Sequence, residues 1–102
     1  MDFEKRTKTL RLRGDIEKWF GRCCYALEKA KFKLVRDDRR SGTIEARYKG
    51  FTIEGNLSLT LTDNAGMVEL RIVVSADTGN LFAMFKDPCE RIMYAFTSYL
   101  RD

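Results

Sequence analysis

Apolar and polar residues alternate along several stretches of this chain, a pattern typical of strands that bury one face. The alternation predicts strands at about 5–13 and 31–37, followed by three strands between residues 43 and 75. The apolar positions are Leu10 and Leu12; Phe32 and Leu34; Ile44, Ala46 and Tyr48; Ile53, Leu57, Leu59 and Leu61; and Val68, Leu70, Ile72 and Val74. Each predicted strand therefore has one apolar and one polar side.

Spacings of three and four residues replace the alternation in two stretches and predict amphipathic helices. The first helix follows Asp15, whose carboxylate can accept hydrogen bonds from the free amides of the first turn. The second begins at Asp87-Pro88-Cys89-Glu90, which resembles a capping box with proline at the first helical position. The apolar stripes are Ile16, Trp19, Phe20, Cys23, Leu27 and Ala30 in the first helix, and Cys89, Ile92, Met93, Phe96 and Leu100 in the second.

These elements follow the order β-α-β-β-β-β-α, and a length of 102 residues suits one domain, 1–102. The later strands form an antiparallel meander, with a hairpin turn at 63–66 in which Gly66 or Asn64 supplies a positive φ. The apolar stripes of the two helices must be buried, and the apolar face of the sheet is the surface available to cover them. We therefore expect an α+β two-layer sandwich with both helices packed on one face. Gly55, on the inward side of its strand, predicts a bend or a close approach of a helix.

The β-α-β4-α order resembles the TATA-binding-protein-like class, which includes helix-grip relatives of the Bet v 1 type. The run Ala26-Leu27, Phe32-Lys33-Leu34-Val35, Asp38 and Gly42-Thr43-Ile44-Glu45-Ala46 is similar to small bacterial domains of unassigned function. The resemblance covers nearly the whole chain and is one of topology. It implies either a DNA-reading sheet face or a ligand cavity beneath the C-terminal helix. The many large apolar residues favour a packed core, with room for a small apolar pocket at most.

The predicted open face of the sheet is polar. It carries Thr7, Thr9, Arg11, Arg13, Lys33, Thr43, Glu45, Arg47, Thr52, Glu54, Asn56, Ser58, Thr60, Thr62, Glu69 and Arg71. A TATA-type reader inserts apolar wedges from such a face into the minor groove, and this set contains no aromatic residue. Its glutamates, Glu45, Glu54 and Glu69, would repel phosphate, so we expect them to pair across strands with Arg47 or Arg71. A solvated, threonine-rich surface is the favoured interpretation.

The net charge of +4 is unevenly distributed. Residues 1–40 hold 13 Lys and Arg against 7 Asp and Glu, a net +6, whereas residues 41–102 hold 6 against 8, a net −2. The first strand and residues 29–40 could be neighbours in the sheet, which would gather these cations. The candidate basic surface consists of Arg11, Arg13, Lys33, Arg39 and Arg40. Weak, salt-sensitive binding of nucleic acid without sequence preference is the alternative function that this surface predicts.

The chain offers little catalytic or metal-binding chemistry. It contains no histidine, the commonest general base and metal ligand. Its three cysteines make neither a disulfide framework nor a recognisable zinc site, and we expect Cys23 and Cys89 to be buried and Cys24 to be nearer solvent. We predict no catalytic residue, no cofactor and no bound metal. Reduced thiols and the absence of a long apolar run predict a cytoplasmic protein without a membrane span.

An apolar run from Leu81 to Phe85 lies between the meander and the last helix and follows neither a helical nor a strand period. It is either a strand in the core or an exposed interface or lid, for which Leu81, Phe82 and Phe85 are the candidate residues. Val73 faces outward on the last strand, which could pair with a second copy at its edge. We predict a non-catalytic domain that binds a partner protein, including a second copy of itself, or a small apolar ligand.

Overall fold

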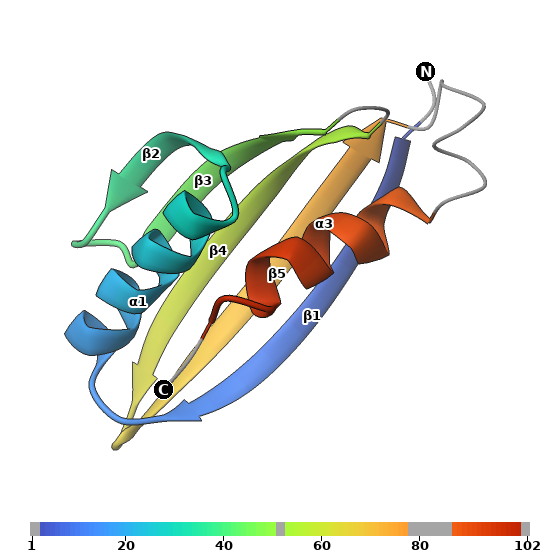
Figure 1. Ribbon diagram of the computed structural model, residues 1–102. Coiled ribbons are helices and arrows are strands. Elements are labelled where there is room, and N and C mark those ends of the chain that lie inside the picture. Colours follow the sequence, from blue (N-terminus) through green and yellow to red (C-terminus); the bar gives the residue numbers. More distant parts are fainter. Residues whose placement is uncertain (1–2, 51–52, 78–86, 101–102) are drawn as a thin grey trace.

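Five strands form one antiparallel sheet, and two helices lie on one of its faces (Figure 1). The computed structural model describes residues 3–50, 53–77 and 87–100. The elements in chain order are β1 (Phe3–Arg13), α1 (Ile16–Lys29), β2 (Lys33–Asp38), β3 (Thr43–Lys49), β4 (Glu54–Asn64), β5 (Met67–Asp77) and α3 (Pro88–Thr97). The predicted α+β class and the β-α-β-β-β-β-α order are confirmed.

The strands lie in the order β1-β5-β4-β3-β2, and all neighbouring pairs are antiparallel. β1 pairs with β5 along its whole length, from Phe3 opposite Asp77 to Arg13 opposite Met67. β1 and β2 are therefore the two edges of the described sheet. The expectation that the last strand of the meander could pair with a second copy at its edge is wrong, because β5 pairs with β1 on one side and with β4 on the other. The expectation that the first strand and residues 29–40 could be neighbours in the sheet is wrong, because β3, β4 and β5 lie between them.

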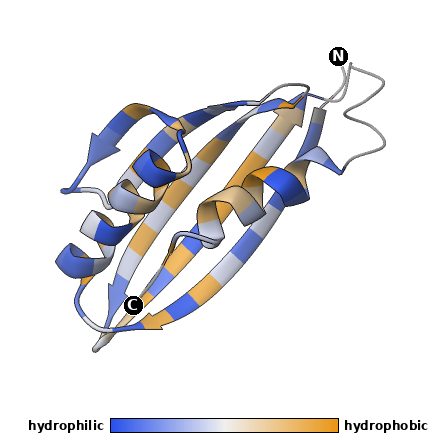
Figure 2. Cartoon of the chain, in the orientation of Figure 1, coloured by the Kyte–Doolittle hydropathy of each residue, from blue (hydrophilic) through white to orange (hydrophobic). Residues whose placement is uncertain are grey.

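Hydrophobic and hydrophilic residues alternate along the strands (Figure 2), and the hydrophobic ones are buried in the core. The predicted apolar residues of β4 and β5 are all buried, and Ala76 joins them. α1 packs on β2, β4 and β5, whereas α3 crosses β5, β4 and β1. The helices bury Trp19, Phe20, Cys23, Ala26 and Leu27 from α1, and Pro88, Cys89, Ile92, Met93 and Phe96 from α3. The predicted packing of both helices on one face is confirmed.

The start of α1 is as the sequence predicts. Asp15 is the N-cap, and its carboxylate accepts a hydrogen bond from the amide of Glu17 (3.4 Å). The indole nitrogen of Trp19 donates to the carbonyl oxygen of Arg13 (2.9 Å), and the amide of Gly14 donates to the carbonyl oxygen of Gly66 (3.1 Å). These bonds hold the beginning of the helix at the end of β1 and against the β4–β5 hairpin.

β2 differs from the prediction in its start and in the side chains that it buries. Lys31 has a φ of 63°, which turns the chain after the helix, so the strand begins at Lys33. Phe32 is buried as predicted, but Leu34, expected on the same face, is 44% exposed. Leu34 lies on an edge strand beside a register shift between Leu34 and Arg36, so it has a strand neighbour on one side alone within the described sheet.

The turn between β4 and β5 uses Ala65 and Gly66, with φ values of 51° and 86°. Two successive positive φ angles are typical of the hairpin turns whose twist suits antiparallel strands. The prediction for Gly66 is confirmed. Asn64, the other residue offered for this role, instead pairs with Met67 in the strand ladder, and Ala65 takes the first left-handed position.

The start of α3 differs from the predicted capping box. Asp87 has a left-handed backbone (φ 49°, ψ 71°) and makes no side-chain capping hydrogen bond among the described residues. Its carboxylate lies 3.1 Å from the guanidinium of Arg6 on β1, and the Glu90 carboxylate accepts a hydrogen bond from the same group (2.9 Å). The carboxylates of Asp87 and Glu90 therefore interact with Arg6 on β1 and not with the free amides of the first helical turn. Pro88 occupies the first turn as predicted.

Gly55 marks a close approach of α3 to the sheet, one of its two predicted roles. A Cβ atom at this position would lie 2.5 Å from the carbonyl oxygen of Ser75 and 2.6 Å from Cδ1 of Ile92. A residue without a side chain is therefore required where α3 crosses β4.

Candidate functional site

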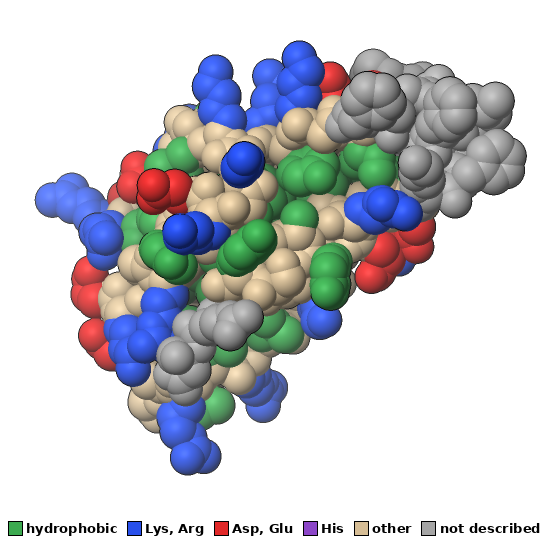
Figure 3. Space-filling model, viewed as in Figure 1, with side chains coloured by type: hydrophobic (Ala, Val, Ile, Leu, Met, Phe, Trp, Pro, Cys, Tyr) green, Lys and Arg blue, Asp and Glu red, His purple; other side chains and the backbone are tan. Residues whose placement is uncertain are grey.

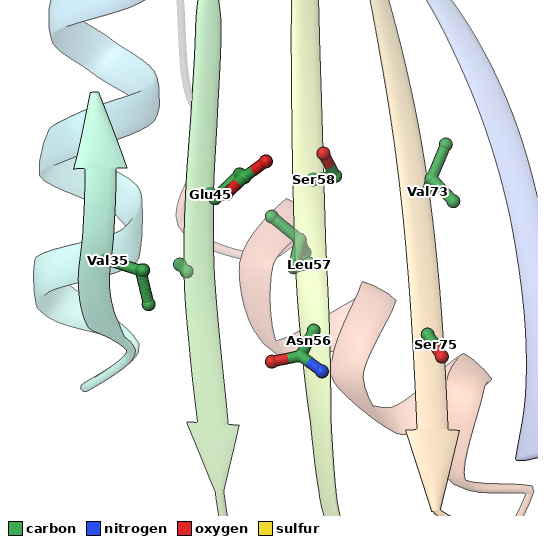
Figure 4. Close-up of a pocket in the computed structure, with 8 residues that line it drawn as sticks. Val35, Glu45, Asn56, Leu57, Ser58, Val73 and Ser75 are labelled. Atoms are coloured by element: carbon green, nitrogen blue, oxygen red, sulfur yellow. The ribbon is translucent and has the colours of Figure 1, made fainter. Parts of the chain in front are cut away.

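The sheet face opposite the helices, the open face, contains a hollow of about 210 Å³ (Figure 4). Its lining residues are Val35, Glu45, Ala46, Asn56, Leu57, Ser58, Val73 and Ser75. They come from β2, β3, β4 and β5, and α3 lies behind the strands in this view. We call this cavity the outer hollow. It lies away from α3, whereas the helix-grip resemblance implies a cavity beneath the C-terminal helix.

The outer hollow exists because short side chains occupy the centre of the open face. Ser58 lies opposite Val73, and Asn56 lies opposite Ser75, across the β4–β5 ladder. On the other side of β4, Ser58 lies opposite the longer Glu45. A depression results where short outward side chains have longer neighbours. Sequence analysis placed Asn56 and Ser58 on this face but missed the hollow, for which the signal was this local run of short residues.

Val35 forms the wall of the outer hollow at the β2 edge. The register shift between Leu34 and Arg36 inserts an extra residue into β2, and the Val35 side chain points toward β3 (Figure 4). Such bulges commonly redirect a side chain. Val35 is 63% exposed, and Val73, which the sequence predicted to face outward, is half-buried. Two apolar side chains thus border the outer hollow from different strands.

A second hollow of about 120 Å³ adjoins the first, since both are lined by Asn56 and Ser75. Its other lining residues are Arg47, Glu54, Gly55 and Asp77. The two hollows form a trough over β3, β4 and β5. One part of the trough offers apolar contact, and the other offers charged groups.

The open face carries more positive than negative charge. By strand register, its cations are Lys5, Arg11, Arg13, Lys33, Arg36, Arg47, Lys49 and Arg71, and its carboxylates are Asp38, Glu45, Glu54, Glu69 and Asp77, a net +3. The predicted pairing of Glu45, Glu54 and Glu69 with Arg47 or Arg71 is wrong. Within the described chain these residues form no such ion pair, because the register places Arg36, Lys49 and Arg11 opposite the three glutamates.

The five residues of the candidate basic surface fall into two groups. Arg11 and Arg13 lie on β1, whereas Lys33 lies on β2 and Arg39 and Arg40 follow in the next turn. Because strands lie about 4.8 Å apart, these edges are separated by about 19 Å. The structure does not bring the two groups together.

Arg39 takes part in the packing of α1. Its guanidinium donates a hydrogen bond to the carboxylate of Glu17 (2.7 Å) and lies 4.6 Å from the ring centroid of Phe20. Exposed ion pairs and cation–π contacts of this kind each contribute up to about 1 kcal/mol. Arg39 is therefore held on the helix side rather than on the open face. The amide of Arg40 donates to the Asp38 carboxylate (3.0 Å), which shapes the turn.

The candidate interface or lid residues Leu81, Phe82 and Phe85 lie outside the described residues, within 78–86. The choice between a core strand and an exposed interface at this segment stays a prediction.

The helix side carries its own exposed aromatic residues. Tyr25 of α1 is 57% exposed, Tyr94 of α3 is 72% exposed, and Tyr99 is 45% exposed. The amino group of Lys29 lies 5.6 Å from the Tyr25 ring centroid. Figure 3 shows hydrophobic side chains over the helices, with Lys and Arg around much of the margin. These rings stand on a convex helical surface, so they provide controls for the open face in the experiments below.

The three cysteines are free thiols with raised pKa values. Cys23 and Cys89 are buried and Cys24 is partly exposed, as the sequence predicts. Burial raises the pKa of Cys23 to about 12. Burial and the nearby Glu4 raise the pKa of Cys89 to about 11, and burial followed by Asp37 raises the pKa of Cys24. These thiols are protonated at neutral pH, which makes them poor nucleophiles.

Sequence analysis missed an ionic cluster that joins β1 to α3. The guanidinium of Arg6 lies 3.3 Å from the Glu4 carboxylate, 3.1 Å from Asp87 and 2.9 Å from Glu90. Desolvation by itself would lower the pKa of Arg6, but the three carboxylates raise it. The thiol of Cys89 donates to the carbonyl oxygen of Glu4 (3.2 Å). More than 80 residues separate the β1 partners from those at α3, so no local pattern could reveal the contacts between the two elements.

No group of three Cys, Asp or Glu side chains in the described part of the chain is arranged to hold a metal ion. Within the same residues, no helix combines the length and the apolarity that crossing a membrane requires. The outer hollow itself offers hydrogen-bond donors, hydrogen-bond acceptors and apolar contact.

Comparison with known proteins shows the fold and no family. No family model matches the chain, and no curated protein matches it. Among solved structures, the chain is similar to the adenylate sensor from AMP-activated protein kinase in complex with 5-aminoimidazole-4-carboxamide 1-β-D-ribofuranotide. The TM-score is 0.61 at 18% identity, and the match covers 87% of this chain and 94% of that chain. At this identity the likeness shows a shared fold.

Proposed function

We propose that this chain is a non-catalytic protein-binding module whose partner docks on the open face and places an apolar side chain in the outer hollow. The observation that carries the proposal is the outer hollow itself. Val35 and Val73 border it, while Asn56, Ser58 and Ser75 supply polar groups within reach. An apolar centre surrounded by hydrogen-bonding groups is the usual anatomy of a protein interface.

The size of the outer hollow favours a partner's side chain over a free small molecule. Pockets that enclose small molecules measure about 300–1,000 Å³, and this one measures about 210 Å³. Stable interfaces bury about 800 Å² on each partner. The two longer dimensions of the molecule, 44 and 22 Å, bound a face of comparable area.

The charge of the open face indicates the chemistry of the partner. Its net +3 favours a docking surface rich in Asp and Glu around the apolar side chain. Two copies of this chain placed face to face would each present that same positive charge. A different, acidic partner protein therefore fits better than a second copy.

The chemistry of the ionisable groups supports a non-catalytic role. The raised pKa values of Cys23 and Cys89 keep both thiols neutral, and burial removes them from the open face. The described residues that line the outer hollow supply one carboxylate, that of Glu45, beside hydroxyl and amide groups. We place the module in the reducing cytoplasm, because the thiols are free.

Nucleic acid and nucleotides fit the open face less well. The cations of the candidate basic surface are divided between two edges of the sheet. Among the described residues that line the outer hollow, there is no aromatic ring on which a base could stack. We retain the resemblance to TATA-binding-protein-like domains as a proposal about fold, without a DNA-reading role.

Substitution of Val73 by arginine tests the proposal, because the long side chain would occupy the outer hollow. Tyr94→Arg adds the same charge at an exposed site on the helix side and is the matched control. Immobilised wild-type protein and both variants are exposed to a lysate, and bound proteins are quantified by mass spectrometry with amine-reactive cross-linking. We expect an acidic partner that cross-links to Lys5, Lys33 or Lys49 and is retained about tenfold less by Val73→Arg, with Tyr94→Arg unchanged.

Four results would contradict this proposal. Val73→Arg could retain every protein that the wild type retains. Sedimentation velocity could show a wild-type dimer that Val73→Arg dissociates, which assigns the face to a second copy. Native mass spectrometry could show a small molecule bound to the wild type and lost from the variant. A DNA duplex could compete for the same lysines as strongly as any protein.

A further inference from the structure

The outer side of β1 is a regular, unpaired strand edge. β1 pairs with β5 through eleven consecutive residue pairs without a register shift, and no described strand pairs with its other side. In an antiparallel ladder, alternate residues direct their N–H and C=O groups away from the neighbour, so an edge strand can pair with an added strand. At the end of the strand, the carbonyl oxygen of Arg13 already accepts a bond from the indole nitrogen of Trp19 (2.9 Å). The part of the edge without such a bond runs from Lys5 to Leu12.

β2, the other edge of the sheet, is a much poorer template. It has six residues, and its ladder with β3 is interrupted between Leu34 and Arg36. Short length and a bulge are two ways in which proteins block pairing at an exposed edge. β1 has neither feature. Any strand added to this sheet would therefore pair with β1.

The charge of β1 selects the kind of strand that it can accept. Its residues Phe3–Arg13 include five cations against one carboxylate, a net +4 that equals the net charge of the whole chain. Arg6 is held by Glu4, Asp87 and Glu90. The other cations are exposed and form no ion pair with any residue that the structure describes; they are Lys5, Lys8, Arg11 and Arg13.

These cations lie on both sides of the strand. Lys5, Arg11 and Arg13 share the open face, whereas Lys8 lies opposite the inward Ile72 and so is on the helix side. A second copy of β1 would set cations against cations, which is unfavourable across a strand pair. A nucleic acid can neutralise the cations but offers no peptide groups to the edge. An extended acidic peptide satisfies both requirements.

We propose that β1 binds an extended acidic segment of a partner protein as a sixth strand of the sheet. The segment pairs with the backbone from Lys5 to Leu12. Residues two apart on a strand lie about 6.8 Å apart on the same face, so alternate Asp or Glu side chains can follow the cations along β1. The inference concerns a surface other than the outer hollow and does not depend on it.

The probe is a synthetic peptide of alternating Glu and Thr, matched in length to the edge from Lys5 to Leu12 and titrated into the ¹⁵N-labelled protein by NMR. A second peptide has the same charge but carries proline in place of the central threonines, which removes amide donors that the ladder needs. We expect amide shifts and slowed hydrogen exchange confined to β1 and β5. We expect the proline peptide to bind about tenfold more weakly.

Variants that change the charge at different sites show whether the peptide binds at the β1 edge or elsewhere on the protein. Lys8→Gln with Arg11→Gln should weaken binding of the Glu-Thr peptide about tenfold. Lys29→Gln with Lys31→Gln removes the same charge near the end of α1 and should leave binding within about twofold. Val73→Arg should not weaken binding of this peptide, because it adds a cation opposite Thr7 of β1. A failure of the outer hollow therefore cannot be mistaken for a failure of the edge.

Several outcomes would overturn the inference. They are absence of binding at millimolar peptide, equal affinity for the two peptides, shifts centred away from β1, and equal binding of β1 to a DNA duplex of similar charge. The last result would show that the cations recognise polyanions in general.

Discussion

Leu57 and Ser58 are neighbours on β4, but their side chains lie on opposite faces of the sheet. Leu57 is 1% exposed and packs beneath the helices, whereas Ser58 points into the outer hollow. Val74 and Ser75 repeat the arrangement on β5. The side chains on the helix-covered face must be apolar, because the area that they bury stabilises the fold. The side chains on the open face bury less area, so they can form a docking surface at little cost in stability.

The free-energy contributions of the side chains explain why the two faces of the sheet can differ so much in sequence. Full burial of a Leu, Val or Ile side chain contributes about 1.5–3 kcal/mol. An exposed ion pair contributes about 0–1 kcal/mol. Inward substitutions should therefore act on folding, and outward substitutions should act on binding. The following predictions test that division, beginning with the largest expected effect.

Phe96→Ala should lower the free energy of unfolding by about 3–5 kcal/mol, because Phe96 is fully buried between α3 and the sheet. Urea unfolding followed by circular dichroism measures the change. Tyr94→Ala is the control on the same helix, 72% exposed, with an expected loss below about 1 kcal/mol. Equal losses in the two variants would show that α3 does not pack through the side that carries Phe96.

Gly55→Ala should cost about 1–3 kcal/mol, because the new methyl group would collide with the Ser75 carbonyl oxygen and with Ile92. Asn56→Ala, one residue away on the open face, should cost less than about 0.5 kcal/mol. Thermal unfolding of both variants gives the comparison. A neutral Gly55→Ala would mean that α3 does not approach β4 closely.

Alkaline pH should lower the free energy of unfolding, because the buried thiol of Cys23 is held in its neutral form. Its pKa is about 12 in the folded protein against an ordinary 9.0, so the unfolded chain loses this proton first as the pH rises. The stability from the neutral thiol is complete below pH 9 and falls between pH 9 and 12. At pH 10 the loss is about 1.4 kcal/mol.

Urea unfolding at pH 7 and pH 10 measures this loss. The decrease should be about 1 kcal/mol smaller in Cys23→Ala, while Cys24→Ala should keep most of it. If the wild type and Cys23→Ala lost the same stability between the two pH values, the assignment to Cys23 would be refuted.

Val73→Thr should have the smallest effect, below about 0.5 kcal/mol, because Val73 borders the outer hollow and its hydroxyl replacement can reach water. Val74→Thr is the matched control on the next, inward position. It should cost about 1–3 kcal/mol, since the hydroxyl would be buried in an apolar layer. If the two substitutions lowered the free energy of unfolding by similar amounts, the assignment of Val73 and Val74 to different faces of β5 would be wrong.

Local patterns predicted the elements well because each pattern reports which side of an element is buried. The alternation from Ile53 to Val74 and the helical stripe around Phe96 needed no knowledge of neighbouring strands. The capping box at Asp87 failed for the opposite reason. Asp87 has a left-handed backbone, and its carboxylate lies beside Arg6, on a strand far away in the chain, instead of capping the local amides.

The candidate site was less accessible to sequence analysis. Asn56, Ser58 and the outward Val73 were placed on the correct side, since side-chain direction follows from alternation. Val35 could not be placed, because the register shift beside it depends on how β2 pairs with β3. The candidate interface at Phe82 lies outside the described residues and stays a prediction.

By itself, the sequence determined the element order, the two sides of each strand and the apolar stripes of both helices, because these follow from periodicity within short segments. The tertiary structure decided which strands became the edges, since a strand order depends on pairings between residues far apart in the chain. That order separated Arg11 and Arg13 from Lys33. It also left the cationic β1 as the long, regular edge of the sheet and gathered short side chains into the outer hollow.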